Sequence, residues 1–548
     1  MAMTPICSLW IGMLSLMGAA LTHADSTVTA CAVDVQSGAG TNLSQALQAG
    51  GNIYFKCPQP ATIHLTRSYV ISSETWLWGG DAVTLNGDGF LITLNPTSNK
   101  SFNFMISGSA HFEHIALSHF ALPNISYYRS VNASAVRVSS SGSLVLDHVT
   151  VSDSDTPIVS QGNLTITGSL FQNNTGIAVV STSGALSIQN TSFSSNAAAV
   201  FMSGGTITGS AFTANTQGAV DVEYPRMGIQ IRDSSFQGNT GTSAVLLSQL
   251  GASASGAMIV LRRDTFDGND GGSFAGAISI YNPGSPPVFP SGRPQRDPKI
   301  NPFYATLPPT KFDFEFDSFT NNKSEGGAGA LGLDLNQTAG AIVRGGFFTG
   351  NESTSQGGAI NTSGGALTID QGYFKQNRAS SGVAVFAASD RGSVTMANSL
   401  IIENAGSGAA LDLGAASLAN LTIARNSALG LRHAGTGAIS ISNSILDGNA
   451  LGNCQGVPAV ALRVSNLQFG ASDCPGVSVV DPQLDAMYVP GFTSAAVGHA
   501  DASVCRLSPV FGKDVVFQLR NHPLGCTIGA YERPPIKLVP KPNPQFHS

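Results

Sequence analysis

Short segments in the middle of this chain alternate between apolar and polar residues. Each segment carries two apolar residues separated by one position, and the second of them stands five residues before a recurring motif. The apolar pairs are Leu164/Ile166, Leu186/Ile188, Ile229/Ile231, Ile259/Leu261, Phe312/Phe314, Leu367/Ile369, Val394/Met396 and Ile439/Ile441. Polar residues such as Thr165, Ser187 and Gln230 stand between them. Because successive side chains of a strand point to opposite faces, the pattern predicts strands with one buried face.

A motif, Phe-x-x-Asn, follows these strands at a nearly constant interval. It occurs at Phe171/Asn174, Phe193/Asn196, Phe212/Asn215, Phe236/Asn239, Phe266/Asn269, Phe319/Asn322, Phe348/Asn351 and Phe374/Asn377, and aliphatic residues replace Phe at Ile401/Asn404, Ile423/Asn426 and Leu446/Asn449. Most intervals are 19 to 30 residues, and one interval of 53 residues contains an insertion. A period of this length indicates a stacked repeat. We therefore expect an all-β fold, a right-handed parallel β-helix of about 13–15 turns.

The motif also predicts what lies inside the stack. Phe and Asn, three positions apart, would point to opposite faces of a straight strand, but the residues between them are small or turn-forming, which favours a corner. Stacking then places Phe over Phe and Asn over Asn. A buried amide without a partner costs about 1–3 kcal/mol. We therefore expect each Asn to bond to the Asn above and below it and to the backbone of the corner.

The repeat divides the chain into parts. Residues 1–24 are expected to be a signal peptide, 25–60 an N-terminal cap, 61–452 the β-helix, 453–532 a C-terminal cap region and 533–548 a Pro-rich tail. Residues 41–49 predict a short capping helix that begins after Thr41 or Asn42 and ends at Gly50. Residues 282–310 contain nine prolines among 29 residues, so they are expected to leave the β-helix as a large loop.

Composition narrows the classes of partner. Lys and Arg number 27 against 33 acidic residues, and no basic stripe is present, so nucleic-acid binding is not expected. An apolar stretch from Ile6 to Leu21 precedes Thr22-His23-Ala24, which predicts export and cleavage near Ala24. A retained membrane anchor is the alternative. The expected mature chain has no transmembrane segment and is secreted or held at the cell surface.

The cysteines favour disulfide bonds. Of seven Cys, Cys7 lies in the expected signal peptide and the other six lie at the two ends of the repeat. Six cysteines allow fifteen pairings, and proximity favours Cys31–Cys57, Cys454–Cys474 and Cys505–Cys526. A metal site is the rival interpretation, but no Cys-x-x-Cys pair is present. We therefore predict neither a metal site nor a cofactor, and a C-terminal cap that is stapled by disulfides.

The Phe-x-x-Asn motif and the phrase Gly-Gly-Ala-Ile at 357–360 resemble the repeats of polymorphic outer-membrane proteins and related secreted bacterial β-helix proteins. The stretch Cys526-Thr-Ile-Gly-Ala-Tyr-Glu532 resembles a choice-of-anchor-type C-terminal module, and residues 50–57 are similar to the usual start of that group. Thr527 stands where the module commonly has Asp. The resemblance implies an exported protein of the cell surface.

Candidate chemistry is confined to a few outward-facing residues. The column four residues before the motif holds Arg232, Arg262, Glu315, Arg344 and Asp370, and Asp233, Asp264 and Asp317 lie close by at corners. The column fits a polysaccharide-binding or catalytic groove, but its mixed charges also fit an ordinary solvated ion-pair ladder, which we favour. A second cluster, His111, Glu113, His114 and His119, places His111 and His114 on opposite faces of a strand, which argues against one shared metal.

The sequence therefore favours a non-catalytic surface protein that serves in adhesion or glycan binding. Its partners would be an extracellular polysaccharide or a receptor on a cell surface. A polysaccharide lyase or glycoside hydrolase that acts in a groove along the β-helix is the first alternative. A purely structural envelope protein is the second.

Overall fold

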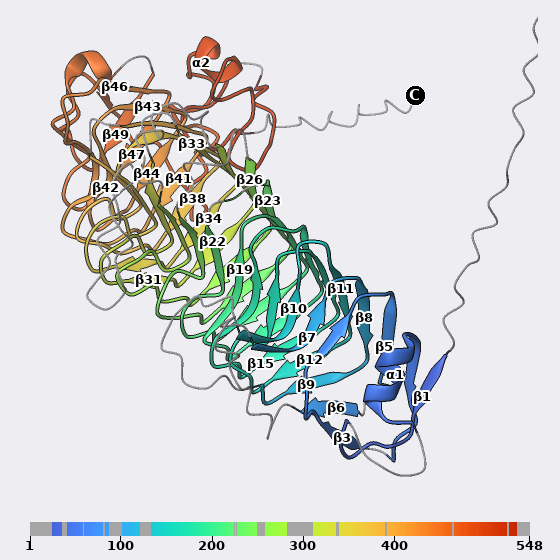
Figure 1. Ribbon diagram of the computed structural model, residues 1–548. Coiled ribbons are helices and arrows are strands. Elements are labelled where there is room, and N and C mark those ends of the chain that lie inside the picture. Colours follow the sequence, from blue (N-terminus) through green and yellow to red (C-terminus); the bar gives the residue numbers. More distant parts are fainter. Residues whose placement is uncertain are drawn as a thin grey trace, which may run out of the picture.

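The computed structural model describes residues 25–34, 41–58, 60–79, 83–86, 101–120, 133–223, 225, 227–248, 258–281, 311–335, 339–388, 392–462, 465–522 and 525–533. The expected signal peptide (1–24), the Pro-rich insertion (282–310) and residues 534–548 of the tail lie outside the described residues. The described chain winds into a long coil that runs from one end of the molecule to the other (Figure 1).

Each turn of the coil contributes one strand to each of three parallel sheets, which we name A, B and C in the order in which the chain meets them. Sheet A has sixteen described strands and sheet C has fifteen, so the described residues build fifteen complete coils. One coil consists of β14 (Asn163–Thr167), β15 (Leu170–Gln172) and β16 (Ile177–Ser181). The right-handed parallel β-helix predicted from the repeat is confirmed.

The strands of the three sheets have the following bounds. Sheet A contains β1 Ser26–Val28, β2 Gly51–Phe55, β5 Thr75–Trp78, β8 Ser109–Glu113, β11 Ser143–Asp147, β14, β17 Leu186–Gln189, β20 Gly205–Thr208, β23 Ile229–Arg232, β26 Met258–Arg262, β29 Lys311–Glu315, β33 Gly340–Arg344, β37 Gly365–Asp370, β40 Gly392–Ala397, β43 Ala416–Ala419 and β46 Ile439–Ser442. Sheet B contains β3 Ala61–His64, β6 Val83–Asn86, β9 Ala116–Ser118, β12 Thr150–Ser152, β15, β18 Ser192–Ser194, β21 Ala211–Thr213, β24 Ser235–Gln237, β27 Thr265–Asp267, β30 Ser318–Thr320, β34 Phe347–Thr349, β38 Tyr373–Lys375, β41 Leu400–Ile402, β44 Thr422–Ala424, β47 Ile445–Asp447, β49 Leu467–Phe469 and β50 Ser478–Val479. Sheet C contains β4 Tyr69–Ile71, β7 Ser101–Ile106, β10 Ala133–Val138, β13 Ile158–Ser160, β16, β19 Ala198–Met202, β22 Val220–Glu223, β25 Val245–Ser248, β28 Ile278–Tyr281, β32 Leu331–Asp334, β36 Ile360–Thr362, β39 Val385–Ala387, β42 Ala409–Leu413, β45 Leu429–His433 and β48 Cys454–Gln455. A short pair, β31 Lys323–Ser324 and β35 Glu352–Ser353, extends two corners.

The alternation in the sequence fills the inside of the coil. Leu164 and Ile166 of β14 are fully buried, whereas Thr165 between them is partly exposed. The motif Phe residues lie in sheet B and stack directly on one another. Along the stack, successive ring centroids are 4.7–5.1 Å apart and successive ring planes differ by 2–14°. The stacked rings are Phe171, Phe193, Phe212, Phe236, Phe266, Phe319, Phe348 and Phe374. The spacing equals the separation of neighbouring strands, so the rings continue the sheet's own repeat.

The motif Asn residues form a second interior column, and each of them is at most 5% exposed. Its members are Asn174, Asn196, Asn215, Asn239, Asn269, Asn322, Asn351, Asn377, Asn404, Asn426 and Asn449. Along the column, each amide Nδ2 donates to the Oδ1 of the next Asn at 2.8–3.0 Å. The residue immediately before each motif Asn has a positive φ, as at Asn173 (56°), and this conformation turns the chain at the corner.

The backbone groups that these amides bond lie at the corners, as expected, and they belong to the preceding coil. Asn215 Nδ2 donates to the oxygen of Phe193 at 3.2 Å, and Asn239 Nδ2 donates to that of Phe212 at 3.0 Å. Asn377 Nδ2 repeats this bond to the oxygen of Phe348 at 2.9 Å. The amide reaches across because neighbouring coils are only about 4.8 Å apart. Each Asn therefore ties its coil to both neighbours, and the buried amides are satisfied by the stack itself.

A helix covers the first coil. Helix α1 (Leu43–Ala49) begins after Asn42, whose side chain accepts from the backbone of Gln45, and it ends at Gly50. Leu43 and Ala46 are buried, and the helix packs on β1 and β4. The β-helix begins at β2, before the boundary expected at residue 61, because Ile53 of β2 already pairs with Leu77 in the register of sheet A.

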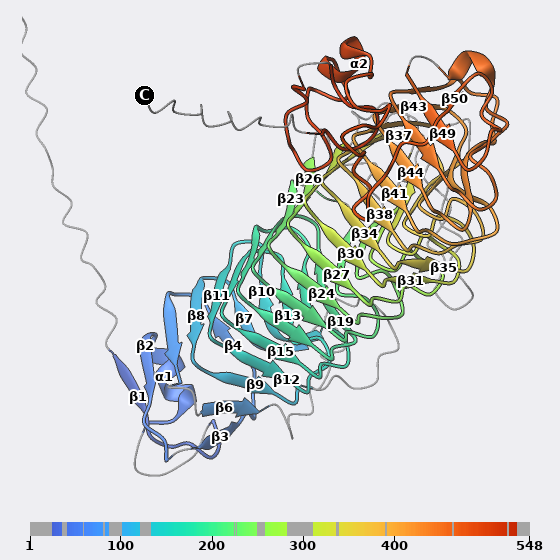
Figure 2. The ribbon, with the colours of Figure 1, turned by 180° about the vertical axis from the view of Figure 1, so that it is seen from behind.

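The C-terminal region has two parts. β48, β49 and β50 continue the coil past the expected boundary at residue 452 because they keep its parallel pairing. The residues that follow, 481–533, contain the short helix α2 (Ala502–Arg506) and are named here the C-terminal segment. This segment lies along the side of the last coils, where Tyr488, Val515 and Ala530 pack against β41 and Ala424 on the outer face of sheet B (Figure 2). The region therefore covers a side of the β-helix as well as its end.

Arg520 fastens the C-terminal segment to the coil. Its buried guanidinium donates to Asn398 Oδ1 at 3.1 Å and to the main-chain oxygens of Thr527 and Gly529 at 3.0 and 2.9 Å. It also lies 3.5 Å from Glu532 Oε2, and both side chains are fully buried. Burial lowers the pKa of Arg520 to about 10, which the Glu532 carboxylate opposes.

The six cysteines pair as proximity suggests. Cys31 bonds to Cys57, Cys454 to Cys474, and Cys505 to Cys526. The first bond ties the strand-bearing N-terminal cap together, the second closes the last coils, and the third lies within the C-terminal segment. Disulfides therefore hold the parts of the described chain in which the stacked motif is missing.

Candidate functional site

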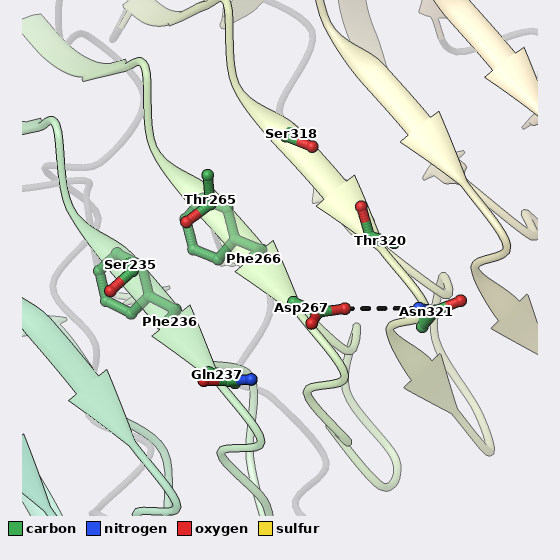
Figure 3. A pocket seen from close by; sticks show the side chains of 9 residues that line it. All are labelled: Ser235, Phe236, Gln237, Thr265, Phe266, Asp267, Ser318, Thr320 and Asn321. Carbon is green, nitrogen blue, oxygen red and sulfur yellow. Dashed lines mark hydrogen bonds between the residues drawn. The ribbon is translucent and has the colours of Figure 1, made fainter.

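A groove lies on the outer face of sheet B, where β24, β27 and β30 run side by side (Figure 3). It has a volume of about 440 Å³. Its lining residues are Ser235, Phe236, Gln237, Thr265, Phe266, Asp267, Ser318, Thr320 and Asn321. Phe236 and Phe266 are buried in the interior stack, so side chains with hydroxyl, amide and carboxylate groups face the solvent.

The polar side chains of this groove stand in two rows because the strands are in register. Ser235, Thr265 and Ser318 pair across neighbouring strands and form the first row, and Gln237, Asp267 and Thr320 form the second (Figure 3). Asn321, at the corner, donates weakly from Nδ2 to Asp267 Oδ1 at 3.4 Å. Each row therefore repeats hydrogen-bonding groups at the strand spacing of about 4.8 Å.

Aromatic side chains bound one end of the groove. Phe347 of β34 pairs with Ser318 and remains 50% exposed. Its ring lies 6.0 Å from that of Tyr373 on the next strand. At the neighbouring corner, Phe316 contacts Phe517 of the C-terminal segment, with ring centroids 5.4 Å apart. The groove thus joins a polar floor to an exposed aromatic wall.

The charged column expected from the sequence lies beside this groove, on the outer face of sheet A. The register places its five residues next to one another: Arg232 pairs with Arg262, Arg262 with Glu315, Glu315 with Arg344, and Arg344 with Asp370. We name Arg232, Arg262, Glu315, Arg344 and Asp370 the charged stripe. The stripe and the groove belong partly to the same coils, on two sides of one corner.

Much of the charge in this stripe is paired internally. Arg344 Nη1 lies 2.8 Å from Glu315 Oε1 and 3.2 Å from Asp313 Oδ1, and Arg262 Nε lies 3.5 Å from Glu315 Oε2. These side chains are 21–42% exposed, and ion pairs of this kind contribute little to stability. Asp370 accepts from Asn398 Nδ2 at 3.0 Å, and burial raises the pKa of Asp370. Arg262, Glu315 and Arg344 of the stripe therefore form ion pairs, and Asp370 is linked through Asn398 to the main-chain oxygen of Val510 in the C-terminal segment.

Two of the acidic residues at the corner are buried in the interior. Asp264 Oδ1 accepts from the backbone of Ser234 at 2.8 Å, and Asp317 Oδ1 accepts from the backbone of Asp264 at 2.9 Å. Burial raises the pKa of Asp264 to about 7. Burial, and then the charge of Asp264, raise the pKa of Asp317 well above its ordinary value. In earlier coils, Ser and Thr hydroxyls occupy the positions of Asp264 and Asp317 and accept from the same backbone N–H groups. The two carboxyl groups therefore serve to hold the corner together. Asp233, by contrast, is exposed and pairs with Arg263 at 2.6 Å, which lowers its pKa.

The motif amides lie apart from the groove and the stripe, although they belong to the same coils. Asn215, Asn239 and Asn377 have no exposed surface, and their donors and acceptors are engaged by the neighbouring coils. A ligand on the outer face of sheet B therefore cannot reach them. The Asn column supports the site by fixing the separation of its strands, and its amides take no part in binding.

The histidine cluster does not converge on one point. His111 faces outward from β8, while His114 and His119 sit at two corners, with φ of 50° and 57°. His114 stacks on His148 of the next coil, with ring centroids 5.0 Å apart. Among the described residues, no group of three or more His, Cys, Asp or Glu side chains is arranged to hold a metal ion.

The sequence reasoning missed the groove and its aromatic wall. The wall depends on contact between Phe316 and Phe517, which are far apart in the sequence. One local signal was present: the outward positions of sheet B change from polar residues such as Ser318 to Phe347 and Tyr373. Within the described residues, no helix has the length and apolar character needed to cross a membrane.

The family comparison agrees with the fold. A family model described as a right-handed beta helix region matches residues 125–269. No curated protein matches this chain. Among solved structures, the chain is similar to PfbA, a surface adhesin of Streptococcus pneumoniae, with 13% sequence identity and a TM-score of 0.28 over 75% of this chain and 86% of that chain. The family match lies within the fifteen-coil body and agrees with its right-handed parallel winding.

Proposed function

We propose that this protein is a non-catalytic, extracellular binding protein that holds a polysaccharide in the groove of sheet B. The observation that carries the proposal is the pairing of two polar rows with an aromatic wall. A sugar ring has hydroxyl groups around its edge and apolar C–H groups on its faces. Rows of hydrogen-bonding groups suit the first, and exposed rings such as Phe347 suit the second.

The chemistry of the lining favours binding over cleavage. A glycoside hydrolase needs two carboxyl groups that face one groove. Of the nine lining residues, Asp267 is the single one with a carboxylate. A lyase that neutralises a uronate needs available cationic groups, and Arg262 and Arg344 of the neighbouring stripe are engaged by Glu315 and Asp313. The groove is therefore built to hold a hydroxylated chain.

The disulfides support an extracellular site of action. Three disulfides in one chain are typical of proteins that leave the reducing cytosol. A polysaccharide that runs across several coils would be held by many weak contacts, which suits adhesion to a cell surface. The resemblance to polymorphic outer-membrane proteins and to a choice-of-anchor-type module stays a prediction, as do the signal peptide and its cleavage near Ala24.

A glycan array of neutral and uronate polysaccharides, probed with the full chain, tests the proposal. We expect binding to at least one glycan class and a loss of binding in Asp267→Ala and in Phe347→Ala. Gln172→Ala, on β15 of the same sheet face and three strands away from β24, is the control and should bind normally. If the two groove substitutions reduce neither the amount nor the affinity of any glycan that binds, the proposed site is wrong. The release of reducing ends or unsaturated products that depends on Arg262 would show an enzyme instead.

A further inference from the structure

A second surface, at the opposite end of the coil, carries exposed aromatic side chains. Tyr54 on β2 and Trp76 and Trp78 on β5 face outward from sheet A, and we name these three residues the aromatic platform. Trp76 is 40% exposed and Trp78 is 45% exposed, while Leu77 between them is buried. The strands β5, β8 and β11 lie side by side at this end of the molecule (Figure 1). The platform lies on a different sheet and on different coils from the groove.

The rings of this platform are held in fixed positions. The indole N–H of Trp76 donates to Glu74 Oε1 at 3.3 Å, and its ring lies 4.0 Å from the ring of His111 on the next strand. The ring of Trp78 meets the edge of Tyr54, with centroids 5.9 Å apart. Two large rings held on a flat sheet, with 40–45% of their surface in water, lose little conformational freedom when a ligand covers them.

Polar groups alternate with these rings along the sheet. Along one outward row, Trp76 stands between Asn52 and His111, and along the next row Trp78 stands between Tyr54 and Glu113. Nε2 of His111 is buried and has no hydrogen-bond partner among the described residues, since Glu113 Oε2 lies 3.8 Å away. The ring of Trp76, 4.0 Å from that of His111, covers this nitrogen, so Asn52 and Glu113 supply the accessible polar groups of the two rows.

The charge of this surface indicates which ligand fits. Glu74, Glu113 and Asp147 lie on or beside the rows, and Asp25 accepts from Asn52 Nδ2 at 3.0 Å at their edge. Lys56, an exposed cationic side chain, follows the end of β2 two positions beyond Tyr54. An acidic surface disfavours polyanions such as nucleic acids and uronate polymers. A neutral sugar chain presents apolar ring faces to the aromatic groups and hydroxyl groups to the carboxylates and amides.

We infer that the aromatic platform is a binding site for a neutral oligosaccharide, separate from the groove of sheet B. The chain would run across the strands, because neighbouring rungs are about 4.8 Å apart, which is close to the length of one sugar ring. One sugar would stack on Trp78 and a neighbouring sugar on Tyr54, while Asn52 and Glu113 would bond to hydroxyl groups. This site does not depend on the function proposed for the groove.

Tryptophan fluorescence measures this site directly. The chain has three Trp, of which Trp10 lies in the expected signal peptide and the other two belong to the platform. In a full-length Trp10→Phe background, emission therefore reports the platform alone. The probes are neutral hexasaccharides of glucose, mannose, galactose and N-acetylglucosamine, with oligogalacturonate as the anionic comparison. We expect a saturable change in emission with at least one neutral probe and none with oligogalacturonate.

Substitutions separate this site from the groove. Trp76→Ala and Trp78→Ala should each weaken binding, measured by calorimetry, by about tenfold or more, because each removes a large stacking surface. Trp78→Phe should recover part of the affinity, since it keeps an aromatic face. In the groove variants Asp267→Ala and Phe347→Ala, the same probe should still produce the full change in tryptophan emission, and thermal melting should show that all variants fold.

Three results would overturn the inference. One is that no neutral probe changes the emission at millimolar concentration. Another is that the stoichiometry and the affinity measured by calorimetry stay the same in Trp76→Ala and Trp78→Ala. The third is a platform that instead pairs two copies of the chain, seen as a concentration-dependent dimer that Trp78→Ala abolishes.

Discussion

Replacing one amide of the Asn column tests whether the column stabilises the coil. Asn322 is fully buried, and its Oδ1 accepts from the backbone N and from Nδ2 of Asn269 at 3.1 and 2.9 Å. Its Nδ2 donates to the oxygen of Phe266 and to Asn351 Oδ1, both at 2.9 Å. Asn322→Ala removes all four bonds, although Asn351 Oδ1 still accepts from the backbone N of residue 322.

The loss can be estimated from the groups that are left behind. Two donors of Asn269 and the oxygen of Phe266 each lose a buried partner, at about 1–3 kcal/mol for each group. Because Asn269 Nδ2 keeps its bond to the oxygen of Phe236, we expect the lower part of that sum. The free energy of unfolding should fall by about 3–5 kcal/mol. Stability in a solenoid is coupled mainly between neighbours, so the effect should centre on β27, β30 and β34.

Chemical denaturation followed by circular dichroism measures the total loss, and amide hydrogen exchange measures where it occurs. The matched control is Asn321→Gly, next door in the sequence. Asn321 has a φ of 53°, and Gly occupies the same corner position at 238, 268 and 350, so this change should be nearly neutral. If Asn322→Ala lowers the stability by less than about 1 kcal/mol, or raises exchange evenly along the whole coil, the account of the column is wrong.

Three further predictions concern buried groups and the C-terminal segment. In the folded protein the pKa of Asp264 is raised to about 7, so its carboxyl group stays protonated up to about that pH. In the unfolded chain the same group loses its proton above its ordinary pKa of 3.8. Stability should therefore fall as the pH rises from about 4 to about 7, by up to roughly 4 kcal/mol from this group, and Asp264→Asn should flatten that slope in melting curves. Arg520→Leu should destabilise the protein by about 3–5 kcal/mol, because Glu532 is left as an unpaired buried charge, and should expose the C-terminal segment to protease. Paired replacement of Cys505 and Cys526 by Ser should lower the stability by about 3 kcal/mol, since their bond closes a loop with a sequence separation of 21.

Each of these predictions has a control. Asp233→Asn alters an exposed carboxylate at the same corner and should leave the slope with pH in place. Arg506→Leu alters an exposed arginine of the same segment and should leave protease resistance intact. Asp264→Asn curves that keep the full loss between pH 4 and 7 would show that another group causes it. Normal stability and protease resistance in Arg520→Leu would mean that the segment is held by its apolar contacts alone.

The fold was predictable because its information is local and repeated. Each strand pair such as Leu164/Ile166 and each Phe-x-x-Asn corner predicts its own geometry, and recurrence in phase predicts the stacking. The extent of the coil was less predictable. The strands at both ends, β2 and β49, lack the motif and are recognised by pairing with neighbours such as β5 and β47.

The sites were harder to predict because they depend on which coils become neighbours and on the C-terminal segment. The charged stripe could be read from one column of the repeat, and the structure does bring its members together. The ion pairs that Arg344 forms with Glu315 and Asp313 could not be predicted from the sequence, because they depend on side-chain conformations. The C-terminal segment joins residues as distant as Gln371 and Asp514, whose contact no local pattern reveals. The apolar outward residues Leu400 and Ile402 were the signal that something covers them.

The Asn column also gives the shaft a polarity. Every link from Asn174 to Asn449 has the same donor direction, toward the C-terminal coil, and the last amide passes its bond to Asn453. Whole turns are therefore interchangeable units: a duplicated or deleted turn leaves the sequence of donors and acceptors unbroken, whereas a partial turn interrupts it. Gene-level changes in the length of such a protein should accordingly come in steps of one full repeat, and the coil would lengthen by one rung at a time.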